Sequence, residues 1–315
     1  MSPSASSASQ ADVAVVDVGS NSVRLVMYRL DGRAIWTVFN EKVLAGLGRD
    51  LAATGRLAPD GIAQAMQALV RFQAIIAANR PAKIYAAATA AVRDARDGSD
   101  FVRRVQAETG LRLKVLTGGE EAKYAALGVI AGSPRAEGLV GDLGGASLEL
   151  TRIIGGEPGS GVTLPLGPFA FPAPFNPDAA RAAVARELRA IRSGFSARTF
   201  NAVGGAWRTL AQLHMRLADY PLGIIHQYEL SRDDALEVAR FIQTQSRGSL
   251  ERIEGISRRR VEALPHAAAV LEGLMEGLGL QRVVLSAFGL REGLLLESMN
   301  RLTRQEDPLI AGCAA

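Results

Sequence analysis

Apolar and polar positions along the chain predict two successive α/β halves. In the first half, short apolar runs indicate strands and a helical spacing of apolar residues indicates helices, in the order β-β-β-α-β-α-β-α. Such an order is typical of the α/β class. The expected strands are 13–18, 23–30, 34–44, 83–88 and 111–116, and the expected helices are 59–79, 99–109 and 119–131.

The second half begins in the same way, so the order ββ-α-β-α recurs with an inserted helical portion. Two strands separated by a glycine turn open it, and a helical block precedes the last strand and helix. The expected elements are strands at 138–143, 147–154, 199–203 and 281–286, and helices at 178–193, from about Trp207, within 233–280 and at 290–299.

The repeat is also visible in one motif. Residues 17–22 (DVGSNS) and 142–147 (DLGGAS) share the pattern D-x-G-x-x-S, and each lies between apolar strands. A duplication constrains the fold, so we expect two related α/β domains with a cleft between them and the two turns facing each other.

Turns of this kind suit phosphate. Glycine and serine at a bend expose main-chain N–H groups that bind anions. Asp17 and Asp142 would repel that anion unless a hard cation lay between them, so the pair implies Mg²⁺ or a similar ion such as Mn²⁺. The alternative is that both turns are ordinary hairpins in which each aspartate caps its own turn. Either turn alone favours that alternative, whereas the duplicated pair favours function.

Composition narrows the class of protein. A length of 315 residues favours two domains, and 48% hydrophobic with 22% charged residues is ordinary for a globular chain. No apolar run reaches the ~18 residues of a membrane span, and residues 1–10 predict a loose tail rather than a signal peptide. The single cysteine, Cys313, excludes a disulfide framework, and we expect a cytoplasmic protein.

The basic residues are mostly arginine, and only four are lysine, at a net charge of +4. Arginine suits an anionic substrate, although biased codon usage explains the same excess. The chain has no basic run of five or more residues, so nucleic-acid binding has little support. It also has no GxxxxGK[ST], HExxH or GxSxG motif.

Five segments together resemble the exopolyphosphatase/guanosine pentaphosphate phosphatase (Ppx/GppA) family, within the actin-like and sugar-kinase-like superfamily. The first and fourth resemble its two phosphate loops, the third its catalytic helix start, and the fifth its near-terminal signature. The segments are 17–24 (DVGSNSVR), 89–93 (TAAVR), 118–122 (GGEEA), 142–149 (DLGGASLE) and 286–293 (SAFGLREG). The resemblance implies duplicated ribonuclease H-like domains.

The resemblance implies catalytic roles for four residues. Glu121 matches the general base, although acidic residues at a helix start usually only complement the helix dipole, and Glu120 fits a capping box with Thr117. Asp142 and Glu149 match acidic residues around metal and water. Arg93 matches a phosphate-binding arginine.

The sequence pattern alone also allows purely structural roles for Glu149 and Arg93. Glu149 would be a solvated strand position, and Arg93 would form a surface ion pair with Asp94 or Asp97. Asp17 is the third expected metal ligand, beside Asp142 and Glu149. The expected phosphate-binding residues are Asp17, Gly19, Ser20, Asn21, Ser22, Gly144, Gly145, Ala146, Ser147 and Arg259.

The domain prediction is 11–132 for the first domain and 133–310 for the second. Two positions depart from the family, since Asp97 stands where asparagine is usual and Ala206 replaces a common threonine. The chain lacks a His-Asp dipeptide, so it resembles the short, two-domain form without the further hydrolase domain.

The expected reaction is removal of the terminal phosphate of linear polyphosphate by water that Glu121 activates. The alternatives are hydrolysis of the 5′-phosphate of pppGpp at the same site, a kinase with a weak nucleotide pocket at 204–207, and a non-catalytic filament or sensor. The family implies a homodimer, and no nucleic-acid or membrane partner is expected.

Overall fold

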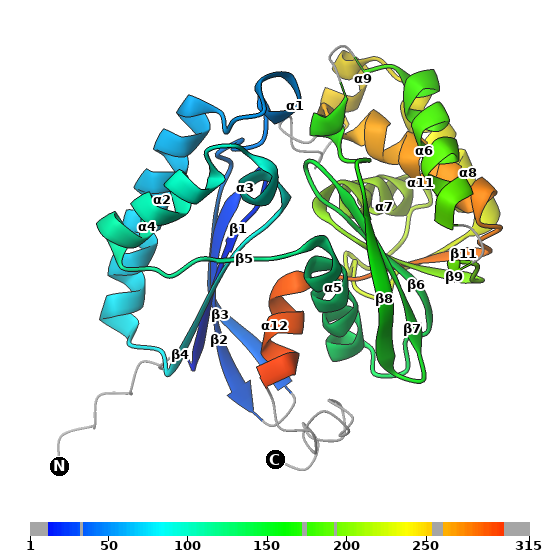
Figure 1. Ribbon diagram of the computed structural model, residues 1–315. Helices are drawn as coiled ribbons and strands as arrows, with labels where there is room; N and C mark the ends of the chain where they lie inside the picture. The colour runs from blue at the N-terminus through cyan, green and yellow to red at the C-terminus, as the bar shows by residue number, and fades with distance from the viewer. Residues whose placement is uncertain (1–11, 32–33, 172–174, 192–193, 254–260, 299–315) are drawn as a thin grey trace. The chain divides into compact units, whose positions relative to one another are not determined.

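The computed structural model describes residues 12–31, 34–171, 175–191, 194–253 and 261–298. Its contacts divide these residues into unit 1, up to Thr117, and unit 2, from Gly118 to Ser298. Figure 1 shows a mixed sheet with helices in each unit.

Unit 1 is built on a five-stranded sheet in the order β3-β2-β1-β4-β5. The first three strands form an antiparallel meander, and β4 and β5 add in parallel to β1. Strand β1 is almost wholly buried because its run of valines packs from both faces. The strands are β1 (Val13–Val18), β2 (Val23–Asp31), β3 (Ala34–Val43), β4 (Lys83–Ala88) and β5 (Lys114–Val115).

The helices of unit 1 are α1 (Leu51–Thr54), α2 (Pro59–Asn79), α3 (Ala90–Asp94) and α4 (Gly98–Thr109). Helix α2 is the one described helix whose length and apolar composition would allow it to cross a membrane. Leu69, Phe72 and Ile76 on its buried face belong to the core formed with β1 and β2. This packing accounts for its apolar character.

Unit 2 repeats the sheet and adds one strand. Its order is β10-β11-β9-β6-β7-β8, so β8-β7-β6-β9-β11 matches β3-β2-β1-β4-β5 in both order and direction, and β10 lies at the far edge. The strands are β6 (Gly138–Leu143), β7 (Leu148–Ile154), β8 (Glu157–Leu164), β9 (Thr199–Val203), β10 (Glu229–Ser231) and β11 (Arg282–Leu285).

Helices cover both faces of the second sheet. Leucines of β6 and β7 share one large core with α6, α7, α8 and α11, while α5 packs on β6, β7 and β8 from the other face and contacts α12. The helices are α5 (Gly118–Gly132), α6 (Pro177–Ile191), α7 (Gly205–Leu217), α8 (Arg232–Thr244), α9 (Arg247–Glu251), α11 (Leu264–Gly277) and α12 (Leu290–Ser298), with a 3₁₀ turn at Pro168–Ala170.

The duplicated α/β class expected from the sequence is confirmed, and most elements begin and end within two residues of the prediction. The structure corrects three details. Strand β5 is much shorter than 111–116, β8 and β10 were not predicted, and the short helices α1 and α3 were missed. The predicted helical block within 233–280 contains α8, α9 and α11. Residues 1–10 and Cys313 lie outside the described residues.

The division of the chain differs from the predicted boundary between residues 132 and 133. It falls before α5 instead of after it, because α5 packs on the strands of unit 2 and on α12. Glu121 therefore groups with Asp142 and Glu149 in one unit.

Candidate active site

The two predicted phosphate loops share one hydrogen-bonded architecture. In the first loop, Gly19 N–H donates to Ser22 O (2.9 Å), Gly46 N–H to Asn21 O (3.0 Å) and Gly48 N–H to Ser20 O (2.8 Å). In the second loop the corresponding three bonds occur in the same order. Gly144 N–H donates to Ser147 O (2.9 Å), Gly167 N–H to Ala146 O (3.2 Å) and Phe169 N–H to Gly145 O (2.8 Å).

These bonds do two things to each loop. One closes the turn on itself, and two fasten it to the segment that follows the third strand of the meander. Ordinary two-residue hairpins need no such outside support. A turn held from outside keeps its peptide groups fixed, and fixed N–H groups are what an anion-binding concavity requires.

The second loop leaves no room for a side chain at Gly167, the residue whose N–H donates to Ala146 O. A Cβ added at Gly167 would lie 2.3 Å from the carbonyl carbon of Ala146 and 2.5 Å from Ser147 N. The main chain of residues 166–167 therefore packs directly on the loop. This glycine was missed from the sequence, and its signal is that a glycine follows the third strand in both halves.

Asp142 and Glu149 face each other across the β6–β7 hairpin. They are direct partners in the antiparallel register, and Glu149 is in turn the direct partner of Thr163 on β8. Direct partners project from the same face of a sheet. Glu149 is buried, with 4% of its surface exposed, so its interpretation as a solvated strand position is wrong.

The start of α5 packs on this same row of residues. A Cβ at Gly118 would lie 1.7 Å from Thr163 Oγ1, and one at Gly161 would lie 2.4 Å from the Cβ of Ala122. The first turn of α5 thus contacts β8 at the level of Glu149. Glu121 belongs to this turn and is buried, with 6% of its surface exposed. A helix-dipole role alone would leave such a carboxylate in solvent.

The near-terminal segment 286–293 also reaches this face. A Cβ at Gly289 would lie 2.7 Å from Val203 Cγ1 and 4.0 Å from Asp142 Oδ2. Gly289 N–H donates to Glu292 Oε2 (2.8 Å), which holds the turn before α12. Three of the predicted motifs therefore meet on one face of the second sheet.

Arg93 lies in unit 1, on the short helix α3 that follows β4. Its Nη1 donates to Leu116 O (3.2 Å), and its Nε pairs with Asp94 Oδ1 at 2.9 Å. The predicted ion pair is thus formed with Asp94. Asp97 instead pairs with Arg56 (3.4 Å) and accepts a hydrogen bond from Leu57 N–H (3.0 Å).

The charge of Asp97 is therefore offset where asparagine is usual in the family. Ser20 and Ser147 are buried within their loops, whereas Asn21 and Gly144 are exposed. Arg259 lies outside the described residues. The structure describes each unit by itself, so the expectation that the two turns face each other stays a prediction.

The residues present fit a hard divalent cation in unit 2. Two carboxylates in direct register, one of them buried, place like charges together, which is costly without a counter-charge. Carboxylate oxygens are the ligands that Mg²⁺ prefers. Among the described residues no three acidic, histidine or cysteine side chains converge. Mg²⁺ commonly uses only one or two carboxylates and takes its other ligands from water and phosphate.

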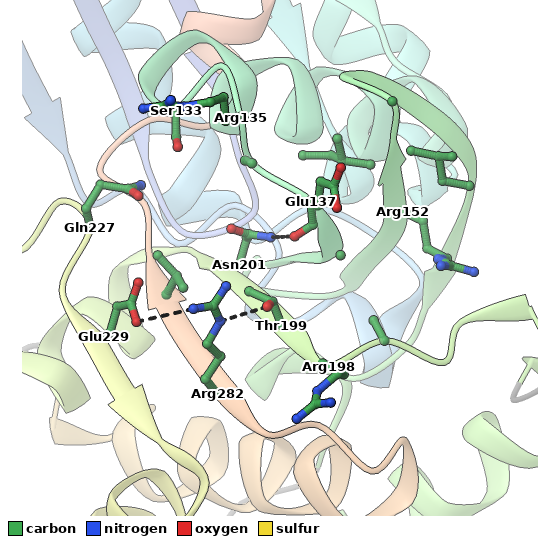
Figure 2. Close-up of a pocket in the computed structure, with 17 residues that line it drawn as sticks. Ser133, Arg135, Glu137, Arg152, Arg198, Thr199, Asn201, Gln227, Glu229 and Arg282 are labelled. Atoms are coloured by element: carbon green, nitrogen blue, oxygen red, sulfur yellow. Dashed lines mark hydrogen bonds and ion pairs between the residues drawn. The ribbon is translucent and has the colours of Figure 1, made fainter.

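A pocket of about 530 Å³ lies elsewhere in unit 2, at the edge where β6, β9 and β11 begin (Figure 2). Arg282 in this pocket donates to Thr199 Oγ1 (2.8 Å) and pairs with Glu229 (3.6 Å). Asn201 donates to Glu137 O (3.0 Å). None of the predicted site residues lines it. Ligands of α/β sheets usually bind at the carboxyl ends of the strands, where both loops lie.

Comparison with known proteins agrees with these motifs. The model of the Ppx/GppA phosphatase family matches residues 25–302. The chain belongs to this family. Exopolyphosphatase 1 of Mycobacterium leprae is 28% identical over 304 residues, covering 91% of this chain and 89% of that protein.

Solved structures show the same likeness. A family member from Aquifex aeolicus has a TM-score of 0.77 at 25% identity, covering 94% of this chain and 99% of that one. A structure described as an exopolyphosphatase-like protein has a TM-score of 0.82 at 26% identity, covering 92% and 98% of the two chains. The protein is a phosphatase, hence a hydrolase, and its fold is that of the solved Ppx/GppA structures.

Proposed function

We propose that this phosphatase releases the terminal phosphate of linear inorganic polyphosphate by direct attack of water. The observation that carries the proposal is the meeting of the α5 start, which bears Glu121, with the Asp142–Glu149 pair on one face of the second sheet. The exopolyphosphatase relatives support polyphosphate as the substrate.

The residues divide the chemistry as follows. Glu121 accepts a proton from the attacking water, whose oxygen bonds to the terminal phosphorus as the anhydride P–O bond breaks. The loops donate main-chain N–H groups to phosphate oxygens, and Arg93 stabilises the charge that develops on them. The products are inorganic phosphate and a chain shortened by one phosphate.

We also propose that Asp142 and Glu149 hold Mg²⁺. When bound, the ion would neutralise phosphate charge and offset the repulsion between the two carboxylates. Asp17 is the least favoured of the three predicted metal ligands, because Arg24 is its direct partner across the hairpin and supplies a positive charge there. The homodimer and the cytoplasmic location stay predictions.

The test is phosphate release by the purified chain from polyphosphate, pppGpp and ATP, with and without Mg²⁺. The proposal expects Mg²⁺-dependent release from polyphosphate as the fastest reaction. Faster release from pppGpp in direct competition would assign the alternative substrate. Formation of ADP only with an added acceptor would indicate a kinase instead.

A further inference from the structure

The repeat extends beyond the loops to the helix that follows the next parallel strand. In unit 1 this helix is α3, with Thr89 as its N-cap, and in unit 2 it is α7, with Gly204 as its N-cap. The fourth residue after the N-cap is Arg93 in unit 1 and Arg208 in unit 2. The N-cap directly follows the strand in both units, but it comes two residues after the partner of Asp17 (Ala87) and one residue after the partner of Asp142 (Val203), so the match is counted from the helix.

Both arginines are anchored in the same way. Arg93 Nη1 donates to Leu116 O, just beyond the end of β5, which lies parallel to β4. Arg208 Nη1 donates to Ala287 O (3.5 Å), just beyond the end of β11, which lies parallel to β9. Each guanidinium is therefore held at the carboxyl end of a neighbouring parallel strand, the edge at which ligands bind.

Arg208 is tied closely to the second phosphate loop. Its Nε donates to Gly204 O (3.1 Å), and Gly204 packs so tightly on the loop that an added Cβ would lie 2.7 Å from Leu143 O. Leu143 directly precedes Gly144 of the loop. Gly204 has φ +119°, which other residues rarely adopt, so the close approach depends on glycine.

The two arginines differ in their sequence neighbours. Arg93 is followed by Asp94, whose carboxylate pairs with its Nε. Arg208 is followed by Thr209, a buried residue whose hydroxyl donates to Gly205 O (3.0 Å), and its Nε turns to a main-chain carbonyl instead. The acidic residue that directly follows Arg93 thus has no counterpart directly after Arg208.

We propose that Arg208 binds phosphate oxygens at the second loop, as the unit 2 counterpart of Arg93. A guanidinium carries five N–H donors in a planar fork, so anchoring at main-chain carbonyls is compatible with contact to phosphate. The inference rests on the proposed function, because it assigns this arginine to the same oligophosphate substrate.

The test uses the full chain with Arg208→Gln, Arg208→Lys and a matched control, Arg216→Gln, which removes an exposed arginine from the same helix. Loss of a charged hydrogen bond to substrate lowers kcat/KM for phosphate release by about 10- to 100-fold in Arg208→Gln. Arg208→Lys keeps the charge without the fork and recovers part of the loss. The control stays within about twofold of the wild type.

A second readout separates phosphate binding from a purely structural role. Tripolyphosphate raises the melting temperature of the wild type and of Arg216→Gln, and raises that of Arg208→Gln and Arg208→Lys by clearly less. An unchanged tripolyphosphate shift in a folded Arg208 variant, or kcat/KM equal to that of the control, overturns the inference. If Arg208→Gln does not fold, Arg208→Lys carries both measurements.

Failure of the proposed function looks different. A wild type that binds tripolyphosphate but releases no phosphate from any of the three substrates refutes the hydrolase reaction as proposed. The comparison of melting temperatures still decides whether Arg208 contacts the phosphates.

Discussion

In unit 1 the residue directly across the hairpin from Asp17 is Arg24, and the next partner on β3 is Lys42. In unit 2 the residue directly across from Asp142 is Glu149, and the next partner on β8 is Thr163. The row in unit 1 therefore carries one acidic and two basic side chains. The equivalent row in unit 2 carries two acidic side chains and no basic one.

This difference separates what the duplication kept from what it changed. Both units kept the strand order and the three hydrogen bonds of the loop, and these are main-chain features that suit an anion. The side chains beside the loop diverged. The row in unit 1 carries one acidic and two basic side chains, whereas the row in unit 2 carries two carboxylates, and the helix with Glu121 packs on the strands of unit 2. We infer that the units share substrate binding and that unit 2 supplies the hydrolytic groups.

The largest expected effect is loss of the general base in unit 2. Glu121→Gln keeps the size of the side chain but cannot accept the proton of water, so turnover falls by about 10²- to 10⁴-fold. Initial rates of phosphate release measure it, with Glu120→Gln on the same helical turn as the control. Near-normal turnover in Glu121→Gln would remove Glu121 from the mechanism.

The next largest effect is expected from substitutions in the segments that hold the two loops, which are residues 46–48 for the first loop and 167–169 for the second. Gly167→Ala forces a methyl group into the main chain of the second loop, so it destabilises the fold by about 1–3 kcal/mol and lowers phosphate release. In Gly48→Ala of unit 1 the added methyl group would lie 3.1 Å from Ser20 Cβ, 3.2 Å from Ala91 Cβ and 3.5 Å from Ser20 Cα, so a smaller loss is expected.

Denaturant unfolding of both variants measures the difference between the supports. Gly159→Ala serves as the control, since its nearest contact would be Arg152 O at 3.4 Å. Equal unfolding free energies for Gly167→Ala and Gly159→Ala would show that the main chain of the second loop accommodates the methyl group, which would contradict the expected destabilisation.

The smallest expected effect is on the pH dependence of stability. It arises from His266, which contacts Leu166, the residue before the segment that holds the second loop. His266 is 2% exposed, and its Nε2 lies 2.9 Å from Leu166 O. Burial lowers its pKa below the ordinary 6.5, while the hydrogen bond to Leu166 opposes that shift. The unfolded chain then binds the proton more tightly than the folded chain does.

Stability is therefore full above pH 6.5 and falls as the pH drops below that value. Melting temperatures between pH 5 and 8 test this, with His214→Gln as the control. In His266→Gln the part of the pH dependence that arises from this group disappears. The same slope in the wild type and in His266→Gln would contradict the assignment.

Much of the fold could be predicted because apolar runs are long and glycine turns are distinct. Helix α2 and strands β1, β4, β6 and β9 were predicted with the bounds that the structure has. Strand β8 was not predicted because its first five residues, Glu157, Pro158 and three polar or glycine residues after them, lack the apolar alternation of a strand. The repeat alone would have found it, since β3 holds the equivalent place.

The candidate site could be predicted only in part. The motifs placed the loops and Glu121, but pattern alone favoured a solvated Glu149, because alternation does not tell which face another helix covers. Gly167 and Arg208 were not predicted as site residues. Their roles depend on contacts between distant segments, at Ala146 and Ala287, that no local spacing encodes.

We propose that the acidic row of unit 2 (Asp142 and Glu149), and not its counterpart in unit 1, holds the divalent cation. The most direct measurement is the Mg²⁺ concentration that gives half-maximal phosphate release in the wild type, Glu149→Gln and Arg24→Gln. This Mg²⁺ concentration is expected to rise by about 10-fold or more in Glu149→Gln and to stay unchanged in Arg24→Gln. An unchanged Mg²⁺ requirement in Glu149→Gln would contradict it.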